Sequence, residues 1–141
     1  MIKQNKKLAR AFIFDIDGTL AIRGDRDPFD YTRVGDDTLN KAVDICLYHL
    51  GEDYNIIICS GREGICKAET EQWLHSNKIY YSELHMRKEG DYRADYIVKE
   101  EMWREIIKDN YIVGMFDDRL QVINHARKLG FTVFDVAGNT F

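Results

Sequence analysis

Short runs of β-branched and aromatic residues alternate along this chain with longer stretches of helical periodicity. Five runs are predicted to be strands, at about residues 10–16, 55–59, 80–86, 112–116 and 132–136. The helices that connect them are predicted at about residues 37–50, 63–75, 94–108 and 120–129. This alternation is typical of βαβ units, so we predict an α/β, Rossmann-like fold with a mostly parallel five-stranded central sheet flanked by helices. The last strand should lie at a sheet edge.

A single domain over residues 1–141 is expected, because the length suffices to bury a core and no repeat or linker interrupts the order. Residues 1–8 are expected to form a flexible N-terminal segment. Asp36 or Asp37 should cap the first helix and Gly51 should end it. A composition of 45% hydrophobic and 31% charged residues excludes a disordered chain.

Charge and cysteine content exclude several classes of protein. A net charge of −4 argues against a protein that coats nucleic acid through general basicity, so any polyanion must be bound locally. Cys46, Cys59 and Cys66 lack zinc-like spacing, which favours free thiols in a reducing compartment. No signal sequence and no apolar run of membrane-spanning length is present. We therefore expect a cytoplasmic protein without membrane contact.

Four aspartates lie at the predicted C-terminal ends of two apolar strands. Asp15 and Asp17 follow the first strand, and Asp117 and Asp118 follow the fourth. The carboxyl ends of neighbouring parallel strands open into the crevice where ligands bind, so these side chains should converge if the two strands are neighbours. Carboxylates so close repel one another, and Mg²⁺, which binds carboxylates, waters and phosphate oxygens, removes the conflict. The pattern indicates phosphoryl chemistry.

The spacing of Asp15 and Asp17 separates two tasks. Asp15 can attack phosphorus to form an aspartyl-phosphate, whereas Asp17, projecting to one side, can act as general acid and base. Asp-Gly pairs are also common in ordinary turns, so an Asx turn is the alternative interpretation.

A phosphate-binding segment is the functional interpretation of Ser60-Gly61-Arg62, which follows the second predicted strand. Its hydroxyl, its backbone N–H groups and the N-terminus of the following helix could bind phosphate oxygens. Alternatively, Ser60 only caps that helix.

Two further pairs have similar alternatives. Asp95 and Lys99 are i, i+4 partners, which could form an exposed surface pair or could place Lys99 against Asp15 and the transferring phosphoryl group while Asp95 orients a cation. Asp117 and Asp118 could be only a cap for the helix that follows. Because every such signal lies after a predicted strand or on the helix before one, their combination is far more specific than any member.

Together these residues resemble the haloacid dehalogenase (HAD) superfamily of phosphatases with an aspartate nucleophile. Its four motifs are similar to Asp15-Ile16-Asp17-Gly18-Thr19, Ser60, Lys99 and Asp117-Asp118. A closer resemblance is to the 3′-phosphatase domains of phage polynucleotide kinase-phosphatases, through Arg26-Asp27-Pro28-Phe29-Asp30, Ser60-Gly61-Arg62-Glu63, Lys99-Glu100-Glu101-Met102-Trp103 and Asp117-Asp118-Arg119. It extends from about residue 9 to the C-terminus.

The resemblance implies a role for each matching residue. The catalytic residues would be Asp15 as nucleophile, Asp17 as general acid–base and Lys99 as a cation for the phosphoryl group. The substrate-binding residues would be Thr19, Arg26, Ser60, Gly61, Arg62 and Asp95, the last as a support for the cationic cluster. The Mg²⁺ site would comprise Asp15, the backbone carbonyl of Asp17, Asp117 and Asp118, and which of the last two contacts the metal directly is left open.

The rest of the chain bears on the substrate. It contains no Gly-x-x-x-x-Gly-Lys-Ser/Thr phosphate loop, so no kinase activity is expected from it, and a separate kinase or ligase could act beside it. No large cap domain fits between the motifs, and an uncapped site can admit a polymer end. The basic residues that could ring the opening are Arg23, Arg26, Arg33, Arg62, Arg87, Lys88 and Arg93. The tyrosines that could stack a base, or simply pack, are Tyr31, Tyr92 and Tyr96.

We therefore predict a Mg²⁺-dependent polynucleotide 3′-phosphatase that acts on DNA or RNA ends through an aspartyl-phosphate and leaves a 3′-OH for repair or ligation. The first alternative is a HAD phosphatase for nucleotides or other small phosphate monoesters. The second is a non-catalytic nucleic-acid-binding module on the same scaffold. The sequence leaves open the choice between DNA and RNA, the oligomeric state, and whether this is a natural single-domain protein or an excised domain.

Overall fold

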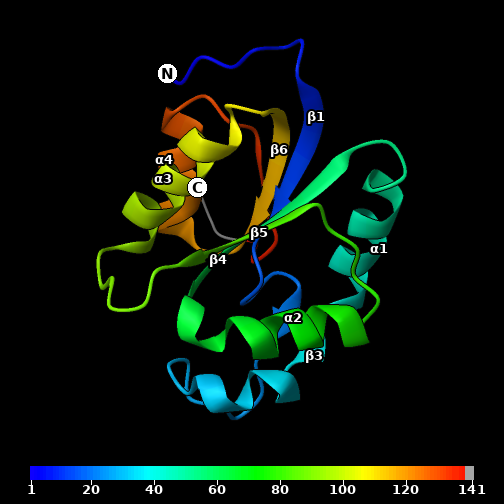
Figure 1. Cartoon of the computed structure of the whole chain (residues 1–141), viewed down its shortest axis with the longest axis vertical. Coiled ribbons are helices and arrows are strands. Elements are labelled where there is room, and N and C mark those ends of the chain that lie inside the picture. Colours follow the sequence, from blue (N-terminus) through cyan, green and yellow to red (C-terminus); the bar gives the residue numbers. More distant parts are fainter. Residues whose placement is uncertain (139–141) are drawn as a thin grey trace.

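Five parallel strands form the centre of the molecule. The computed structural model describes residues 1–138 (Figure 1). The strands are β1 (Ala9–Phe14), β4 (Asn55–Glu63), β5 (Glu83–Arg87), β6 (Asn110–Asp117) and β7 (Val133–Asp135). Their order in the sheet is β5-β4-β1-β6-β7, and each neighbouring pair is parallel. The predicted α/β class, the five parallel strands and the edge position of the last strand are confirmed.

Helices cover both faces of this sheet (Figure 1). Alternate residues of β1 explain why: Ala11 and Ile13 pack toward α3 (Asp95–Ile106) and α4 (Leu120–Lys128), whereas Phe12 and Phe14 pack toward α1 (Lys41–Leu50) and α2 (Lys67–Ser76). A strand that is buried on both faces reads as a continuous apolar run, which is the pattern of parallel sheets. The result is a three-layer arrangement with two cores.

The first helix begins later than predicted. Residues Tyr31–Asp36 form a 3₁₀ helix (η1), and Thr38–Leu39 (β3) pairs antiparallel with Ala21–Ile22 (β2). The prediction that Asp36 or Asp37 caps α1 was wrong, because Asn40 occupies that position. The predicted end at Gly51 is confirmed, since its N–H donates to the carbonyl of Leu47. Within the described residues, only the β2–β3 ribbon and η1 fill the connection from β1 to α1, so no large cap domain lies there.

The second strand is longer than predicted. β4 continues through Ser60, Gly61 and Arg62 to Glu63, and a short 3₁₀ helix (η2, Gly64–Cys66) separates it from α2. Ser60 therefore does not cap a helix, and the helix N-terminus expected directly after this segment is not there. The Ser60 hydroxyl instead accepts a hydrogen bond from the N–H of Arg62, at 3.1 Å. An irregularity in the β4–β5 pairing follows Ser60 and bends the strand end.

The N-terminal segment, expected to be flexible, is anchored on the sheet. The side chain of Gln4 donates to the carbonyl of Ile112 and accepts from its N–H, at 3.0 and 2.7 Å. The N–H of Ile2 donates to the carbonyl of Leu129. Among the described residues, no helix has both the length and the apolar composition that crossing a membrane requires.

Candidate active site

The strand order reverses on either side of β1, which places a crevice at the carboxyl ends of β1, β4 and β6. A cavity of about 1150 Å³ opens there. Its lining includes Asp15, Asp17, Arg62, Lys99 and Asp117. Because β1 and β6 are neighbours, the predicted convergence of their terminal carboxylates is confirmed.

Lys99 lies at the centre of the carboxylate cluster. Its ammonium is buried and donates to Asp15 Oδ1 at 2.9 Å and to Asp117 Oδ2 at 2.7 Å. The hydroxyl of Thr19 is 3.3 Å from Asp15 Oδ2 and 3.3 Å from Asp118 Oδ1. The exposed-pair interpretation of Lys99 was therefore wrong. The Lys99 side chain extends from α3 into the site, where its ammonium neutralises part of the carboxylate charge.

Burial and mutual repulsion govern the protonation of this cluster. Burial raises the pKa of Asp15 well above its ordinary value, Lys99 partly offsets this, and Asp117 and Asp118 raise it further. Burial also disfavours the charged form of Lys99, but Asp15 and Asp117 outweigh that cost, so the Lys99 pKa is raised and its ammonium stays charged. One ammonium facing three carboxylates leaves an excess of negative charge.

The excess negative charge fits a divalent cation. Asp15, Asp117 and Asp118 each offer an oxygen atom, and these atoms lie within 4.8 Å of one another. Carboxylate oxygens are the hard donors that Mg²⁺ prefers. Gly18, at φ +80°, allows this approach, because a Cβ there would lie 2.1 Å from Asp118 Oδ2.

Asp117 belongs to the site, and the interpretation of this residue as only a helix cap was wrong, because the N-cap residue of α4 is Arg119, without a side-chain capping hydrogen bond. The Oδ1 atom of Asp117 accepts from the backbone N–H groups of Asp118 and Arg119, at 2.9 and 3.0 Å, just before α4. Its Oδ2 faces Lys99. The two backbone contacts therefore fix the orientation of a carboxylate that belongs to the site.

Asp17 lies apart from this cluster, in a second network. Its side chain is 45% exposed, compared with 8% for Asp15, so it is the carboxylate that water can reach. Arg62 holds it through Nε and NH2, at 3.0 and 2.8 Å. Arg26 NH2 lies 3.5 Å away. Asp15 and Asp17 therefore differ in burial and in their partners, and their division into nucleophile and general acid–base stays a prediction.

Asp37 completes this network and was missed by the sequence analysis. Its buried carboxylate accepts two hydrogen bonds from Arg26, at 3.0 and 2.9 Å, and one from Arg62, at 3.0 Å. Trp73 Nε1–H donates to its carbonyl. No sequence signal pointed to it, because the two buried guanidinium groups that require a second negative charge beside Asp17 are visible only in the structure.

Arg26 was expected to bind substrate, but here its guanidinium is occupied. Besides Asp37 and Asp17, it donates through NH1 to the carbonyls of Asp27, Pro28 and Asp30. Its contacts are those of a positioning residue, and direct contact with substrate stays a prediction.

Asp95 binds two arginines on the other side of the cavity. Its carboxylate accepts from Arg87 and from Arg119, which agrees with the expected support of a cationic cluster. Gly61 lies against it, since a Cβ on Gly61 would be 2.8 Å from Asp95 Oδ1. Arg87, which the sequence placed only at the rim, is buried and also donates to the carbonyl of Gly61.

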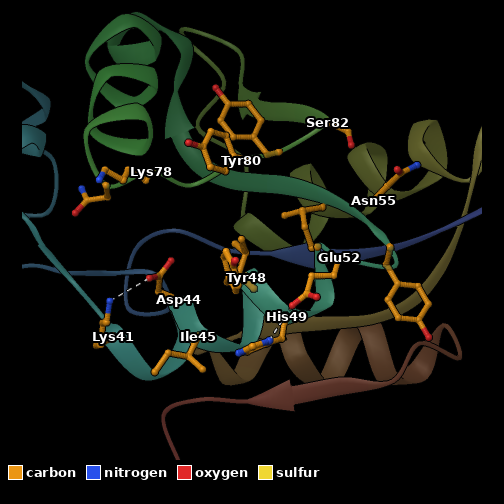
Figure 2. Close-up of a pocket in the computed structure, with 16 residues that line it drawn as sticks. Lys41, Asp44, Ile45, Tyr48, His49, Glu52, Asn55, Lys78, Tyr80 and Ser82 are labelled. Carbon is orange, nitrogen blue, oxygen red and sulfur yellow. Dashed lines mark hydrogen bonds and ion pairs between the residues drawn. The ribbon is translucent and has the colours of Figure 1, made fainter.

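A second hollow, of about 770 Å³, lies between α1 and the segment that leads into β5 (Figure 2). Tyr48 and Tyr80 are exposed in it, and Lys41 pairs with Asp44 at its edge. It shares no lining residue with the first cavity and contains none of the predicted site residues. The reactive groups therefore gather at the carboxyl ends of the strands.

Comparisons with known proteins agree with this geometry. The chain is 33% identical over 136 residues to the "Putative bifunctional polynucleotide kinase/RNA ligase" of Autographa californica nuclear polyhedrosis virus, covering 92% of this chain and 20% of that protein. Two solved chains are similar to it, from structures of the Pnkp1/Rnl/Hen1 RNA repair complex and the Pnkp1/Rnl/Hen1 complex. Their TM-scores are 0.91 and 0.93, their identities 36% and 35%, and the matches cover 96% and 99% of this chain.

The chain spans 44% and 50% of those two solved chains, so it matches one part of longer proteins. The family model described as the polynucleotide kinase PNKP phosphatase domain matches residues 9–141, which is nearly the whole chain and includes all of the site residues described above. The fold, the four HAD motifs and this match lead to one assignment. The chain belongs to the family of polynucleotide kinase PNKP phosphatase domains, within the HAD phosphatases.

Proposed function

We propose that this protein is a Mg²⁺-dependent polynucleotide 3′-phosphatase that acts through an aspartyl-phosphate. The observation that carries the proposal is the separation of two carboxylates in a PNKP-type site. Asp15 is buried against Lys99, and Asp17 is half-exposed and held by Arg62. The ammonium of Lys99 favours the charged form of Asp15 that a nucleophile requires, and the exposure of Asp17 leaves it within reach of a leaving oxygen and of water.

In the first step, an Asp15 carboxylate oxygen attacks phosphorus and the bond from phosphorus to the 3′-oxygen breaks. Asp17 gives its proton to that leaving oxygen, which becomes the 3′-OH. In the second step, Asp17 takes a proton from water, the water oxygen attacks the aspartyl-phosphate, and inorganic phosphate leaves while the Asp15 carboxylate is restored. Lys99 neutralises negative charge on Asp15 throughout. Mg²⁺, held by Asp15, Asp117 and Asp118, would neutralise charge on the phosphoryl oxygens.

The cavity opening supports a polymer end as the substrate. Phe29 and Tyr92, which line the cavity, are 80% and 83% exposed, so the opening presents aromatic surface to solvent. Arg23 also lines it and has no ion pair within residues 1–138, which leaves a cation for a phosphodiester. The names of the relatives, which refer to polynucleotide kinase, RNA ligase and RNA repair, favour nucleic acid.

The test compares matched oligonucleotides, of DNA and of RNA, that carry a 3′-phosphate or a 5′-phosphate, with Mg²⁺ or with EDTA. We expect release of phosphate from the 3′ end only, and only with Mg²⁺. Asp15→Asn should abolish it, whereas Asp53→Asn, at an exposed position outside both cavities, should leave it unchanged. Activity confined to mononucleotides or other small esters, or retained by Asp15→Asn, would contradict the proposal.

A further inference from the structure

Tyr92 lies on the loop that joins β5 to α3, at the opening of the catalytic cavity. Its side chain is 83% exposed, although burial of an aromatic ring is usually favourable. Of the three tyrosines that could stack a base, only Tyr92 is exposed. Tyr31 is partly buried, and Tyr96 packs against His125 with ring centroids 4.9 Å apart.

The side chain of Arg87 holds the backbone on both sides of Tyr92. Arg87 NH1 donates to the carbonyls on both sides of Tyr92, those of Asp91 and Arg93, at 2.9 and 2.6 Å. The carboxylate of Asp91 accepts from the N–H and the guanidinium of Arg93. The loop therefore holds an exposed ring in a defined place, which lowers the entropy lost when a ligand stacks on it.

The same guanidinium connects this loop to the catalytic residues. Arg87 also donates to the Asp95 carboxylate and, through Nε at 2.9 Å, to the carbonyl of Gly61 on β4. Arg87 is buried, so these contacts link the loop to β4 beneath the surface. The backbone that carries the Tyr92 ring is thereby held relative to Gly61 and the end of β4, where the phosphoryl group is expected.

We propose that Tyr92 is a specificity-determining residue that stacks an unpaired base next to the 3′-phosphate. This inference rests on the proposed 3′-phosphatase function. Every base has a π-face, so such stacking tolerates any sequence. A 3′ end without a complementary strand leaves both faces of its last base accessible, so the contact favours single-stranded or frayed 3′ ends.

The experiment measures kcat/KM for a single-stranded oligonucleotide with a 3′-phosphate and for p-nitrophenyl phosphate, which has no base. Tyr92→Ala should lower the oligonucleotide value by about 5- to 100-fold, mainly through KM, and leave the aryl phosphate value within about twofold. Tyr92→Phe keeps the ring and should stay near wild type. Tyr80→Ala is the matched control, because Tyr80 is 74% exposed in the other hollow (Figure 2).

Abasic sites placed singly near the 3′ end then locate the stacked base. One of them should weaken the wild type as Tyr92→Ala does, and should have little further effect on Tyr92→Ala, because both changes remove the same contact. Additive effects, or an unchanged KM in Tyr92→Ala while the wild type removes 3′-phosphate, would overturn this inference alone. A wild type that hydrolyses the aryl phosphate but no oligonucleotide 3′-phosphate would overturn the proposed function, and this inference with it.

Discussion

Asp37 forms ion pairs with two buried guanidinium groups, and these two arginines also hold Asp17. Arg62 binds both Asp37 and Asp17, and Arg26 binds Asp37 through two parallel hydrogen bonds. Bidentate arginine–carboxylate pairs fix geometry as well as charge. The general acid–base is therefore held by residues that are themselves held by Asp37.

Asp37→Asn should destabilise the fold and lower activity on all substrates. The substitution leaves two buried arginines short of one negative charge, and breaking a buried pair from one side costs about 3–5 kcal/mol. We expect that order of loss in denaturant unfolding, with an equal fall of kcat on oligonucleotide and aryl phosphate. Asp36→Asn is the control, because Asp36 forms only an exposed pair with Arg33 and should change little. Wild-type kcat in folded Asp37→Asn would contradict the positioning role.

Residues beside a strand end were predictable from topology, whereas Asp37, late in the long connection after β1, was not. Asp15 and Asp117 follow apolar runs directly, so strand topology alone brings them together. Asp37 precedes a helical pattern, where an aspartate is more often a cap. Its role depends on Arg62, which is 25 residues away in sequence, and no local pattern records that contact.

At the scale of elements, β1 and β4 were found because each carries a continuous run of buried apolar residues. Two of the misplaced boundaries, the start of α1 and the end of β4, are those where tertiary contacts override local propensity. β3 pairs with β2 instead of joining α1, and β4 continues along β5 past Ser60. Both of these segments supply residues that line the catalytic cavity, Ile22 from β2 and Arg62 from β4.

The ends of β1 and β6 should bind Mg²⁺ with a measurable gain in stability. Burial raises the pKa of Asp118, and the hydrogen bond with Asp15 and the charge of Lys99 offset this only in part. Without metal the folded state therefore loses stability as pH rises through 3.8, the ordinary pKa, toward the raised one. Mg²⁺ at neutral pH should raise Tm by several degrees. Asp118→Asn should raise Tm in EDTA and abolish that Mg²⁺ shift. An undiminished Mg²⁺ shift in Asp118→Asn would place the metal elsewhere.

The N-terminal segment should stabilise β6. Pairing between β1 and β6 shifts register between Ala11 and Phe12, opposite Ile112, and Gln4 supplies both hydrogen bonds to the Ile112 backbone. Gln4→Ala should lower the free energy of unfolding by about 1–3 kcal/mol, because it leaves partly buried polar groups unpaired. Lys3→Ala is the control, and equal stability of the two variants would show that the segment does not anchor the strand.

For the molecule as a whole, a net charge of −4 coexists with a site for a polyanion. Most of the basic residues expected to ring the opening are already paired with carboxylates. Asp37 and Asp17 pair with Arg26 and Arg62, and Asp95 pairs with Arg87. Arg33 and Arg93 also have acidic partners. Arginines that are paired in this way position other groups and contribute little to the attraction of a polyanion. The long-range attraction for a polynucleotide must therefore come from few cations.

Arg23 should carry a distinct part of that attraction. Arg23 lines the cavity, is exposed, and has no ion pair in the described part of the chain. It can therefore neutralise a phosphodiester and release the counterion bound to that phosphate. Arg23→Ala should raise KM for a 3′-phosphorylated oligonucleotide at low salt and reduce the slope of log KM against log salt by about 0.7, the value for one phosphate contact on a single strand. Arg33→Ala is the matched control, because Arg33 is also exposed but pairs with Asp25 and Asp36. If both variants shift the slope equally, general charge near the opening, and not one uncommitted cation, guides the substrate.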